Sequence, residues 1–430
     1  MLKRTASDIK QFASLSRRFL LAPLRRFVLI PILMAIIGVV IVGRVTDWWA
    51  GPDSYYIYLA GDYRNDPATA KIFEGFLGAP CEKSDGEIIR DKGIDGVPIR
   101  VKCLDDRGDT AEVRRISNDL AHRDDTLMVM GHIYSTLTKE ALPNYLRQAQ
   151  PAIPVILTAE TNPQLIPAKK AGGDYDPIFR LAPTDDAQAV KAAQFAIDNA
   201  KSQVLWVVED ERNPVYSKYL AMEFVRRVQE REGKVVLWST NMSVPPAETL
   251  RKLKIDFVFF AGDWSNALIL IRQIKRIFPS HRMPVLFLSD AAVDQQLLKY
   301  GGKELDGLSI YLGYPLKAVQ FKDSGFELFG KDARSIIDWL LVDTDQHFVE
   351  ESQAHSRFKY WSMLLLNRHE VEDARSALKS RMMKAVLEER KFSGVLGEYQ
   401  FAHNGNNKQA QWRIWEVKKE NGVYQFVDAE

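Results

Sequence analysis

Residues 126–158, TLMVMGHIYSTLTKEALPNYLRQAQPAIPVILT, decide the fold of this chain. Short apolar runs at 126–131 and 153–158 have the composition and length of buried strands. The amphipathic segment between them, 137–150, is long enough for a helix. A connection of that length lets the two strands pair in parallel. The stretch therefore predicts one strand–helix–strand unit of an α/β fold.

The same alternation continues on both sides of this unit. Before it, strands are expected at 54–61 and 97–104, and after it four apolar strands alternate with helices between 202 and 290. Two successive sets of similar size predict two doubly wound parallel-sheet lobes, and the chain should cross between them within 178–189. The expected first lobe is 54–180 plus about 318–394, and the expected second lobe is about 183–312 plus 398–430.

The amino-terminal region has a membrane-anchor pattern. Residues 1–26 contain seven Lys or Arg against the single acid Asp8, although the whole chain carries only +2. Residues 27–43 then contain no charged side chain. We predict a transmembrane helix at 27–45, a cytoplasmic segment at 1–26, and the rest of the chain outside the cytoplasmic membrane. A cleaved signal peptide is the competing interpretation.

Three hydroxyl side chains, Ser135, Thr136 and Thr138, crowd the junction between the quoted strand and its helix. One Ser or Thr is enough to cap a helix, with a contribution of about 1 kcal/mol. A helix start also presents unpaired N–H groups and the positive end of the helix dipole, which bind anions. The junction therefore predicts either a plain cap or a site for a carboxylate.

Two acids, Asp263 and Asp290, end consecutive strands of the second set. Because the carboxyl ends of parallel strands share one edge of the sheet, both side chains are expected in a cleft opposite Ser135. Each acid could instead cap the helix that follows it. An anion site on one lobe and a cation site on the other would suit a zwitterion, and a ligand that bridges the lobes stabilises only their closed state.

The sequence gives no basis for catalysis or for nucleic-acid binding. It has no G-x-S-x-G, no Gly-rich phosphate loop and no H-E-x-x-H. A basic patch with interleaved aromatic residues is missing as well. We therefore expect no enzyme, no cofactor, no metal and no nucleic-acid partner. Cys81 and Cys103 are the only cysteines, and their spacing does not decide between one disulfide and two free thiols.

Six segments together resemble the type I periplasmic solute-binding proteins, specifically the leucine/isoleucine/valine-binding group. The resemblance covers most of the chain from about 54 to 427. The segments are MVMGHIYSTLT (128–138), VILTAETNPQL (155–165), IFRLAPTD (178–185), VVEDERNPVYSKYLAMEF (207–224), IDFVFFAGDWSNALILIRQ (255–273) and GVLGEYQFAHNGNN (394–407).

That resemblance implies a two-lobed clamshell with three crossovers that closes around an amino acid or a similar small molecule. It implies that Ser135, with Ala159 and Thr161, binds the ligand carboxylate. It also implies that Tyr216 covers the ligand and that Asp290 binds its ammonium group. Asp263 replaces a tyrosine of some members, which suggests a ligand of altered size or charge.

The resemblance also implies a membrane partner, an ABC-type permease that receives the ligand. Two features depart from the group: a membrane anchor is unusual for it, and Tyr134 stands where the amino-acid binders have a cysteine. The anchor leaves open a second function, a ligand-sensing receptor or interaction module that acts on a membrane signalling partner without transport.

Overall fold

The computed structural model describes residues 53–166, 176–315, 325–354, 371–395 and 397–429, without the side chains of 347–354. The predicted segments 1–26 and 27–45 lie outside these residues. Within the described part, none of the helices combines the length and the apolar character that a membrane span requires.

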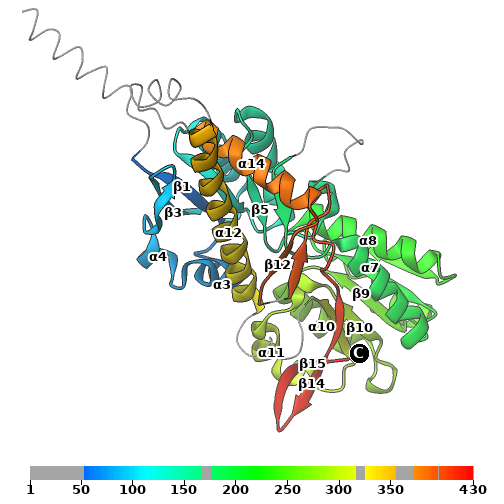
Figure 1. Ribbon diagram of the computed structural model, residues 1–430. Coiled ribbons are helices and arrows are strands. Elements are labelled where there is room, and N and C mark those ends of the chain that lie inside the picture. Colours follow the sequence, from blue (N-terminus) through cyan, green and yellow to red (C-terminus); the bar gives the residue numbers. More distant parts are fainter. Residues whose placement is uncertain (1–52, 167–175, 316–324, 355–370, 396, 430) are drawn as a thin grey trace, which may run out of the picture. The chain divides into compact units, whose positions relative to one another are not determined.

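The first sheet has six strands in the order β2-β3-β1-β4-β5-β6. Figure 1 labels β1, β3 and β5 of this sheet. All pairs are parallel except β2 with β3, so the predicted parallel pairing is confirmed. The strands are β1 (Tyr55–Gly61), β2 (Ile88–Ile94), β3 (Val97–Asp105), β4 (Thr126–Gly131), β5 (Val155–Leu157) and β6 (Ile178–Arg180). All six residues of β4 are buried, as expected for a central strand covered on both faces.

Helices from two separate stretches of the chain, 67–165 and 325–387, belong to the same lobe as this sheet. The helices are α3 (Pro67–Leu77), α4 (Cys81–Ser84), α5 (Thr110–His122), α6 (Ser135–Pro143), η1 (Asn144–Gln148), η2 (Pro163–Leu165), α12 (Gly325–Ala354) and α14 (Val371–Leu387). Helix α12 packs directly on α3, and two glycines allow this close approach. A Cβ on Gly75 would lie 1.9 Å from the carbonyl oxygen of Glu327, and one on Gly330 would lie 1.9 Å from that of Ile72.

The second sheet has seven strands in the order β15-β14-β11-β10-β9-β7-β8. The strands are β7 (Leu205–Glu209), β8 (Val235–Ser239), β9 (Phe257–Ala261), β10 (Val285–Leu288), β11 (Ile310–Tyr314), β14 (Arg413–Glu420) and β15 (Val423–Asp428). The first five are parallel to one another, and β14 and β15 add an antiparallel hairpin beside β11. Two doubly wound sheets, as predicted, are therefore present.

Helices and short helical turns connect the strands of the second sheet. They are α7 (Asp185–Gln194), η3 (Phe195–Asn199), α8 (Pro214–Gln229), α9 (Ala247–Leu253), α10 (Trp264–Ile277), η4 (Ser280–Arg282), η5 (Asp290–Ala292), α11 (Gln295–Gly301) and η6 (Gly302–Leu305).

Three chain connections join the two lobes. They run from β6 to α7, from β11 to α12, and from the end of a small hairpin to β14. That hairpin pairs β12 (Lys391–Ser393) with β13 (Glu398–Gln400), and the predicted lobe boundaries at 394 and 398 fall inside it. Phe401, just after β13, stacks on Phe179 of β6 with ring centroids 3.9 Å apart. The hairpin thus packs against the first sheet.

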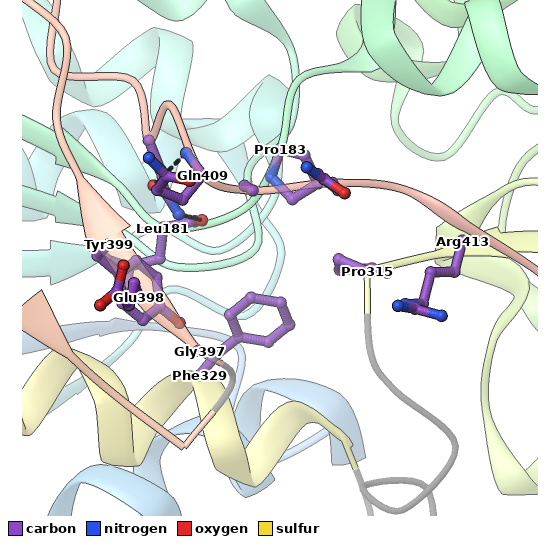
Figure 2. Close-up of a pocket in the computed structure, with 12 residues that line it drawn as sticks. Leu181, Pro183, Pro315, Phe329, Gly397, Glu398, Tyr399, Gln409 and Arg413 are labelled. Carbon is purple, nitrogen blue, oxygen red and sulfur yellow. Dashed lines mark hydrogen bonds between the residues drawn. The ribbon is translucent and has the colours of Figure 1, made fainter.

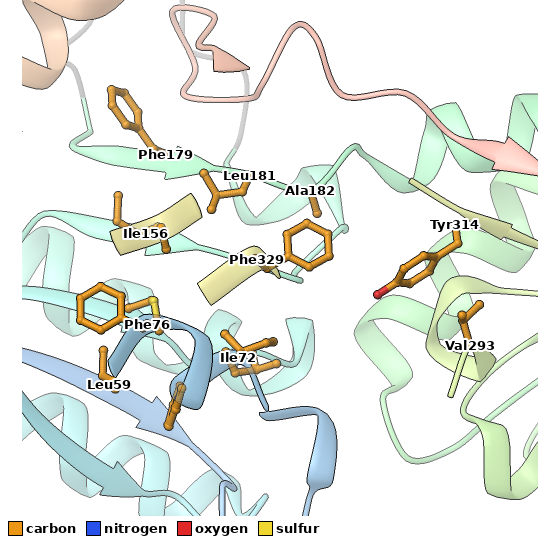
Figure 3. Close-up of a cluster of buried hydrophobic side chains, with 14 of the residues drawn as sticks. Leu59, Ile72, Phe76, Ile156, Phe179, Leu181, Ala182, Val293, Tyr314 and Phe329 are labelled. Carbon is orange, nitrogen blue, oxygen red and sulfur yellow. The ribbon is translucent and has the colours of Figure 1, made fainter. Parts of the chain in front are cut away.

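One hydrophobic core continues through the connections from one lobe to the other. Phe329 of α12 lies between first-lobe side chains such as Ile72 and second-lobe side chains such as Tyr314 (Figure 3). Ala182, in the connection from β6 to α7, belongs to the same core. Apolar packing therefore continues from one lobe into the other.

Cys81 and Cys103 form a disulfide with an S–S distance of 2.07 Å and a Cα–Cα distance of 6.0 Å. It ties the short helix α4 to β3 across a separation of 22 residues. Cysteine spacing left two alternatives open, and the structure has the disulfide rather than two free thiols.

Candidate functional site

The loop after β4 presents Ser135 at the carboxyl edge of the first sheet. Gly131 has a φ of +120°, and a Cβ there would lie 2.0 Å from the carbonyl oxygen of Ala60, so only glycine fits. Ile133 has a positive φ of +37°, which is a rare conformation for a β-branched residue. The turn ends at Ser135, the first residue of α6, whose exposed fraction is 2%.

His132 holds this loop from within the lobe. Its Nδ1 lies 2.7 Å from Oδ2 of Asp106, and its Nε2 lies 2.9 Å from the hydroxyl of Tyr145. All three side chains are fully buried. Our sequence reasoning did not identify this network, because its members come from three separate elements and no motif joins them.

Each of the three crowded hydroxyls has a different environment. The hydroxyl of Thr136 donates to Oδ1 of Asn213, a residue of the second lobe, at 2.6 Å. The hydroxyl of Thr138 donates to Oε1 of Glu160 at 3.1 Å. Ser135 is buried, as Thr138 is, and lies at the start of the helix. The crowding at this junction therefore serves more than one purpose.

The loop after β5 carries the other two residues that were expected to bind a carboxylate. The backbone N–H of Ala159 donates to Oε2 of Glu160 at 3.0 Å, so the neighbouring side chain already occupies it. Burial raises the pKa of Glu160 to about 7. Thr161 is 3% exposed, and its carbonyl oxygen accepts from the backbone N–H of Asp185 at 3.0 Å. Thr161 thus lies where the two lobes meet.

In the second lobe, the structure pairs Tyr216 with Asp290. The Tyr216 hydroxyl donates to Oδ1 of Asp290 at 2.5 Å. Burial raises the pKa of Asp290 to about 6, while the Tyr216 hydrogen bond acts to lower it. Burial, and then the charge of Asp290, raise the pKa of Tyr216 well above its ordinary value. The tyrosine is therefore a hydrogen-bond donor that stabilises the ionised form of this acid.

Asp263 takes the capping role that the sequence left open for it. Its Oδ1 accepts from the backbone N–H groups of Ser265 and Asn266, at 2.7 and 3.0 Å, at the start of α10. Its Oδ2 pairs with the guanidinium of Arg212 at 3.0 Å. Both carboxylate oxygens are engaged within the second lobe.

Asp185 is a candidate that our sequence reasoning missed. It begins α7 and is fully buried, and its carboxylate oxygens meet no described residue in strict hydrogen-bonding geometry, although a contact from the Thr161 side chain acts to lower its pKa. Burial raises the pKa of Asp185 well above its ordinary value, and the charge of Asp290 adds to the shift. A buried carboxyl group with so few hydrogen-bond partners is costly. A cation placed beside it would remove that cost.

Arg180 is the buried basic group of the same region. Its Nη2 donates to the carbonyl oxygen of Asn162 at 2.6 Å, whereas Nε and Nη1 find no partner among the described residues. Burial lowers the pKa of Arg180 to about 10, and the charges of Asp185 and Glu160 oppose this shift. In the described part of the chain, no group of three or more His, Cys, Asp or Glu side chains could hold a metal ion.

A continuous series of contacts links the candidate residues across the lobes. Ser135 precedes Thr136, whose hydroxyl accepts from the backbone N–H of Val215 at 3.1 Å. Val215 precedes Tyr216, which bonds Asp290. Asp290 acts electrostatically on Asp185, and the backbone of Asp185 bonds Thr161. The structure therefore gathers these residues at one junction between the lobes, with Asp263 engaged as a helix cap beside it.

A cavity of about 310 Å³ lies elsewhere, beside the three connections (Figure 2). It contains none of the candidate residues. It is lined by Leu181, Pro183, Pro315, Phe329, Gly397, Glu398, Tyr399, Asn407, Gln409, Ala410, Gln411 and Arg413. Most polar side chains there already have partners: Tyr399 donates to Asp332 at 2.7 Å, for example.

Comparisons with known proteins agree with this architecture. The sequence model of the periplasmic binding protein family matches residues 86–422. An amino acid binding protein of Pseudomonas aeruginosa is 25% identical over 255 residues, which are 58% of this chain and 61% of that protein. A Leu/Ile/Val-binding protein of Escherichia coli is 26% identical over 206 residues, 46% of this chain and 52% of its own. The matched part thus spans between half and two thirds of these relatives.

A solved structure shows the same fold. The leucine-binding protein of Thermotoga maritima superimposes with a TM-score of 0.64 over 87% of this chain and 97% of its own, at 16% identity. The resemblance drawn from the six sequence segments is therefore confirmed. With a family match across most of its length and two parallel-sheet lobes, the chain belongs to the periplasmic binding protein family, whose members bind solutes rather than catalyse reactions.

Proposed function

We propose that this chain is a membrane-anchored, extracytoplasmic solute-binding protein that captures an amino acid or a similar small zwitterion between its two lobes. The relatives named for amino acid and Leu/Ile/Val binding support this class of ligand. An ABC-type importer is the proposed recipient. The observation that carries the proposal is the pair of buried acids, Asp185 and Asp290, where the lobes meet.

These two acids form the proposed cation end of the site. Asp185 is fully buried, and the Thr161 side chain is its hydrogen-bonding contact among the described residues, outside strict geometry; one oxygen of Asp290 is bound by Tyr216. An ammonium group has three N–H donors and a positive charge. It would therefore supply the missing hydrogen bonds and relieve the repulsion between the two carboxylates.

Ser135 and Thr161 are the main donors proposed for the anion end. Both are nearly fully buried. Ser135 precedes Thr136, which bonds Asn213 of the second lobe, and Thr161 itself bonds Asp185 of the second lobe. Thr136 and Ala159 were expected to share this role, but Asn213 and Glu160 occupy their backbone N–H groups. They would contribute only after these partners have moved. Asp263 remains a proposed second-lobe contact of lesser weight, because the helix cap engages one of its oxygens and Arg212 the other.

Isothermal titration calorimetry with an amino-acid panel tests the proposal. The full-length protein in detergent should bind at least one member, and Ser135→Ala combined with Asp290→Ala should abolish that binding while the circular dichroism spectrum stays unchanged. Ser335→Ala, which removes an exposed hydroxyl on α12, is the matched control and should bind like the wild type. Undiminished affinity in the double variant would remove the site assignment.

The anchor and the lobe boundaries are part of the same proposal. Residues 1–26 would lie in the cytoplasm and 27–45 would span the membrane, because the apolar run follows seven basic residues. The first lobe would comprise 54–180 plus about 318–394. We place the start of the last second-lobe segment after Phe401 rather than at 398, because β13 pairs with β12.

A sensory function without transport is the second candidate, favoured by the predicted membrane anchor at 27–45. Uptake of the bound amino acid by cells decides between the two. If the protein delivers ligand, deleting it should reduce uptake; if it reports occupancy to a signalling partner, uptake should be unchanged.

A further inference from the structure

Two helices meet across the lobe boundary, and neither is capped by its own N-cap side chain. Helix α6 begins after Tyr134, and helix α8 begins after Asn213. Asparagine at this position usually accepts a hydrogen bond from its own helix. The Asn213 side chain makes no such bond, so the first donors of both helices must be satisfied in another way.

Each helix is capped by a side chain of the other. Oδ1 of Asn213 accepts from the backbone N–H of Thr136 at 3.1 Å and from its hydroxyl at 2.6 Å. In return, the Thr136 hydroxyl accepts from the backbone N–H of Val215, in the first turn of α8, at 3.1 Å. Because Thr136 N–H is a donor only, the amide of Asn213 must present its oxygen to it.

A further bond joins the lobes beside this pair. The amide nitrogen of Asn162 donates to the carbonyl oxygen of Val215 at 2.6 Å, while its oxygen accepts from Gln164 within the first lobe. Asn162 is fully buried, and its carbonyl oxygen also accepts from Arg180. One side of this contact is therefore fixed before the lobes meet.

We infer that Thr136, Asn162 and Asn213 form an interlobe latch that holds the two lobes together in the absence of ligand. All four hydrogen bonds join the lobes, so each is present only when the lobes are closed. The latch lies beside Asp185 and Asp290, which repel each other within the second lobe. If the proposed function is right, the three side chains are positioning residues, because ligand affinity scales with the population of the closed state.

The distance between the lobes, measured without ligand, tests the latch. Spin labels at Asn118→Cys on α5 and Lys299→Cys on α11 are exposed and lie on different lobes. Both native cysteines are in the disulfide, so only the introduced thiols react. Pulsed electron paramagnetic resonance of the full-length protein in detergent then reports the populations of closed and open lobes.

Asn213→Ala and Thr136→Val should each lower the ratio of closed to open protein about tenfold, the factor expected when caps of this kind are lost. The double variant should open by less than the product of the two single effects, because both remove the bond from the Thr136 hydroxyl to Asn213. Thr136→Ser keeps the donor and the hydroxyl and should stay closed. Asn144→Ala removes a 2.6 Å bond to Ser117 inside the first lobe and should not change the distance.

Closed populations equal to the wild type in both Asn213→Ala and Thr136→Val would overturn the latch, as would equal opening by Asn144→Ala. Thermal melts identify any variant that does not fold, and Asn213→Ala is the safer of the two because its side chain caps nothing in its own lobe. A parallel sample with excess L-leucine tests the proposed function separately. If leucine changes the interlobe distance in no variant, leucine is not the ligand. The ligand-free measurements still show whether the latch exists.

Discussion

The Tyr216 hydroxyl donates a 2.5 Å hydrogen bond to Asp290, 74 positions further along the chain. Tyr216 lies in the first turns of α8, and Asp290 follows β10, so the bond joins two elements at the carboxyl edge of the second sheet. Hydrogen bonds to a carboxylate favour its ionised form. The tyrosine thus prepares Asp290 to receive a cation.

Removing this hydroxyl should weaken ligand binding. Tyr216→Phe keeps the ring but deprives Asp290 of its donor, so the pKa of Asp290 should rise further. We expect affinity at about pH 7 to fall roughly tenfold, the effect of losing one charge-assisted hydrogen bond. Calorimetry measures this change; Tyr219→Phe, a neighbouring tyrosine on α8, serves as control. Equal losses in both variants would contradict a specific role for Tyr216.

Ligand affinity should fall in acid. Burial raises the pKa of Asp290 to about 6, and a cationic ligand binds its ionised form. Affinity should therefore be constant above about pH 7 and decrease about tenfold per pH unit well below 6. Titrations across this range check it, and in Asp290→Asn the decrease near pH 6 should disappear. A wild-type affinity that stays constant down to about pH 4.5 would exclude Asp290 as the cation-binding group.

Asp185→Asn should separate stability from binding. The variant removes a buried carboxyl group whose ionised form is disfavoured by burial and by the charge of Asp290. The melting temperature should therefore stay the same or rise at about pH 7, while affinity for an ammonium ligand falls about 10- to 100-fold. Asp198→Asn, an exposed acid on η3, is the control. A large loss of stability with unchanged affinity would assign Asp185 a purely structural role.

The disulfide should stabilise the first lobe. Closing a loop of 22 residues restricts the unfolded chain by about 3 kcal/mol in the chain-entropy estimate. We expect Cys81→Ser combined with Cys103→Ser to lower the free energy of unfolding by an amount of this order, with ligand affinity unchanged. Urea unfolding of the variant, with the reduced wild type beside it, measures the effect.

The sequence predicted what local patterns determine and missed what depends on distant packing. The buried strand β4 and the start of α6 at Ser135 follow from apolar runs and a capping junction within a dozen residues. Asn213 is 77 positions from Thr136, and no periodicity links residues so far apart. Asp185 lies within the predicted crossing at 178–189, and its burial could not be predicted because it arises only when α7 packs against α8 and β11.

Glu160 should make stability depend on pH in a defined window. Its pKa is raised from 4.5 to about 7 by burial, so the folded protein holds this proton more tightly than the unfolded chain does. Its contribution to stability is complete below about pH 4.5 and is lost as the pH rises through about 7, by up to about 3 kcal/mol. Glu160→Gln cannot ionise, yet its side-chain oxygen can still accept from Thr138 or from the Ala159 N–H. The variant should therefore lose less stability than the wild type between about pH 5 and 8 in chemical unfolding experiments.

Glu248→Gln, which replaces an exposed carboxylate on α9, should follow the wild-type curve. Parallel curves for wild type and Glu160→Gln would mean that Glu160 is ionised in the folded protein across the whole range.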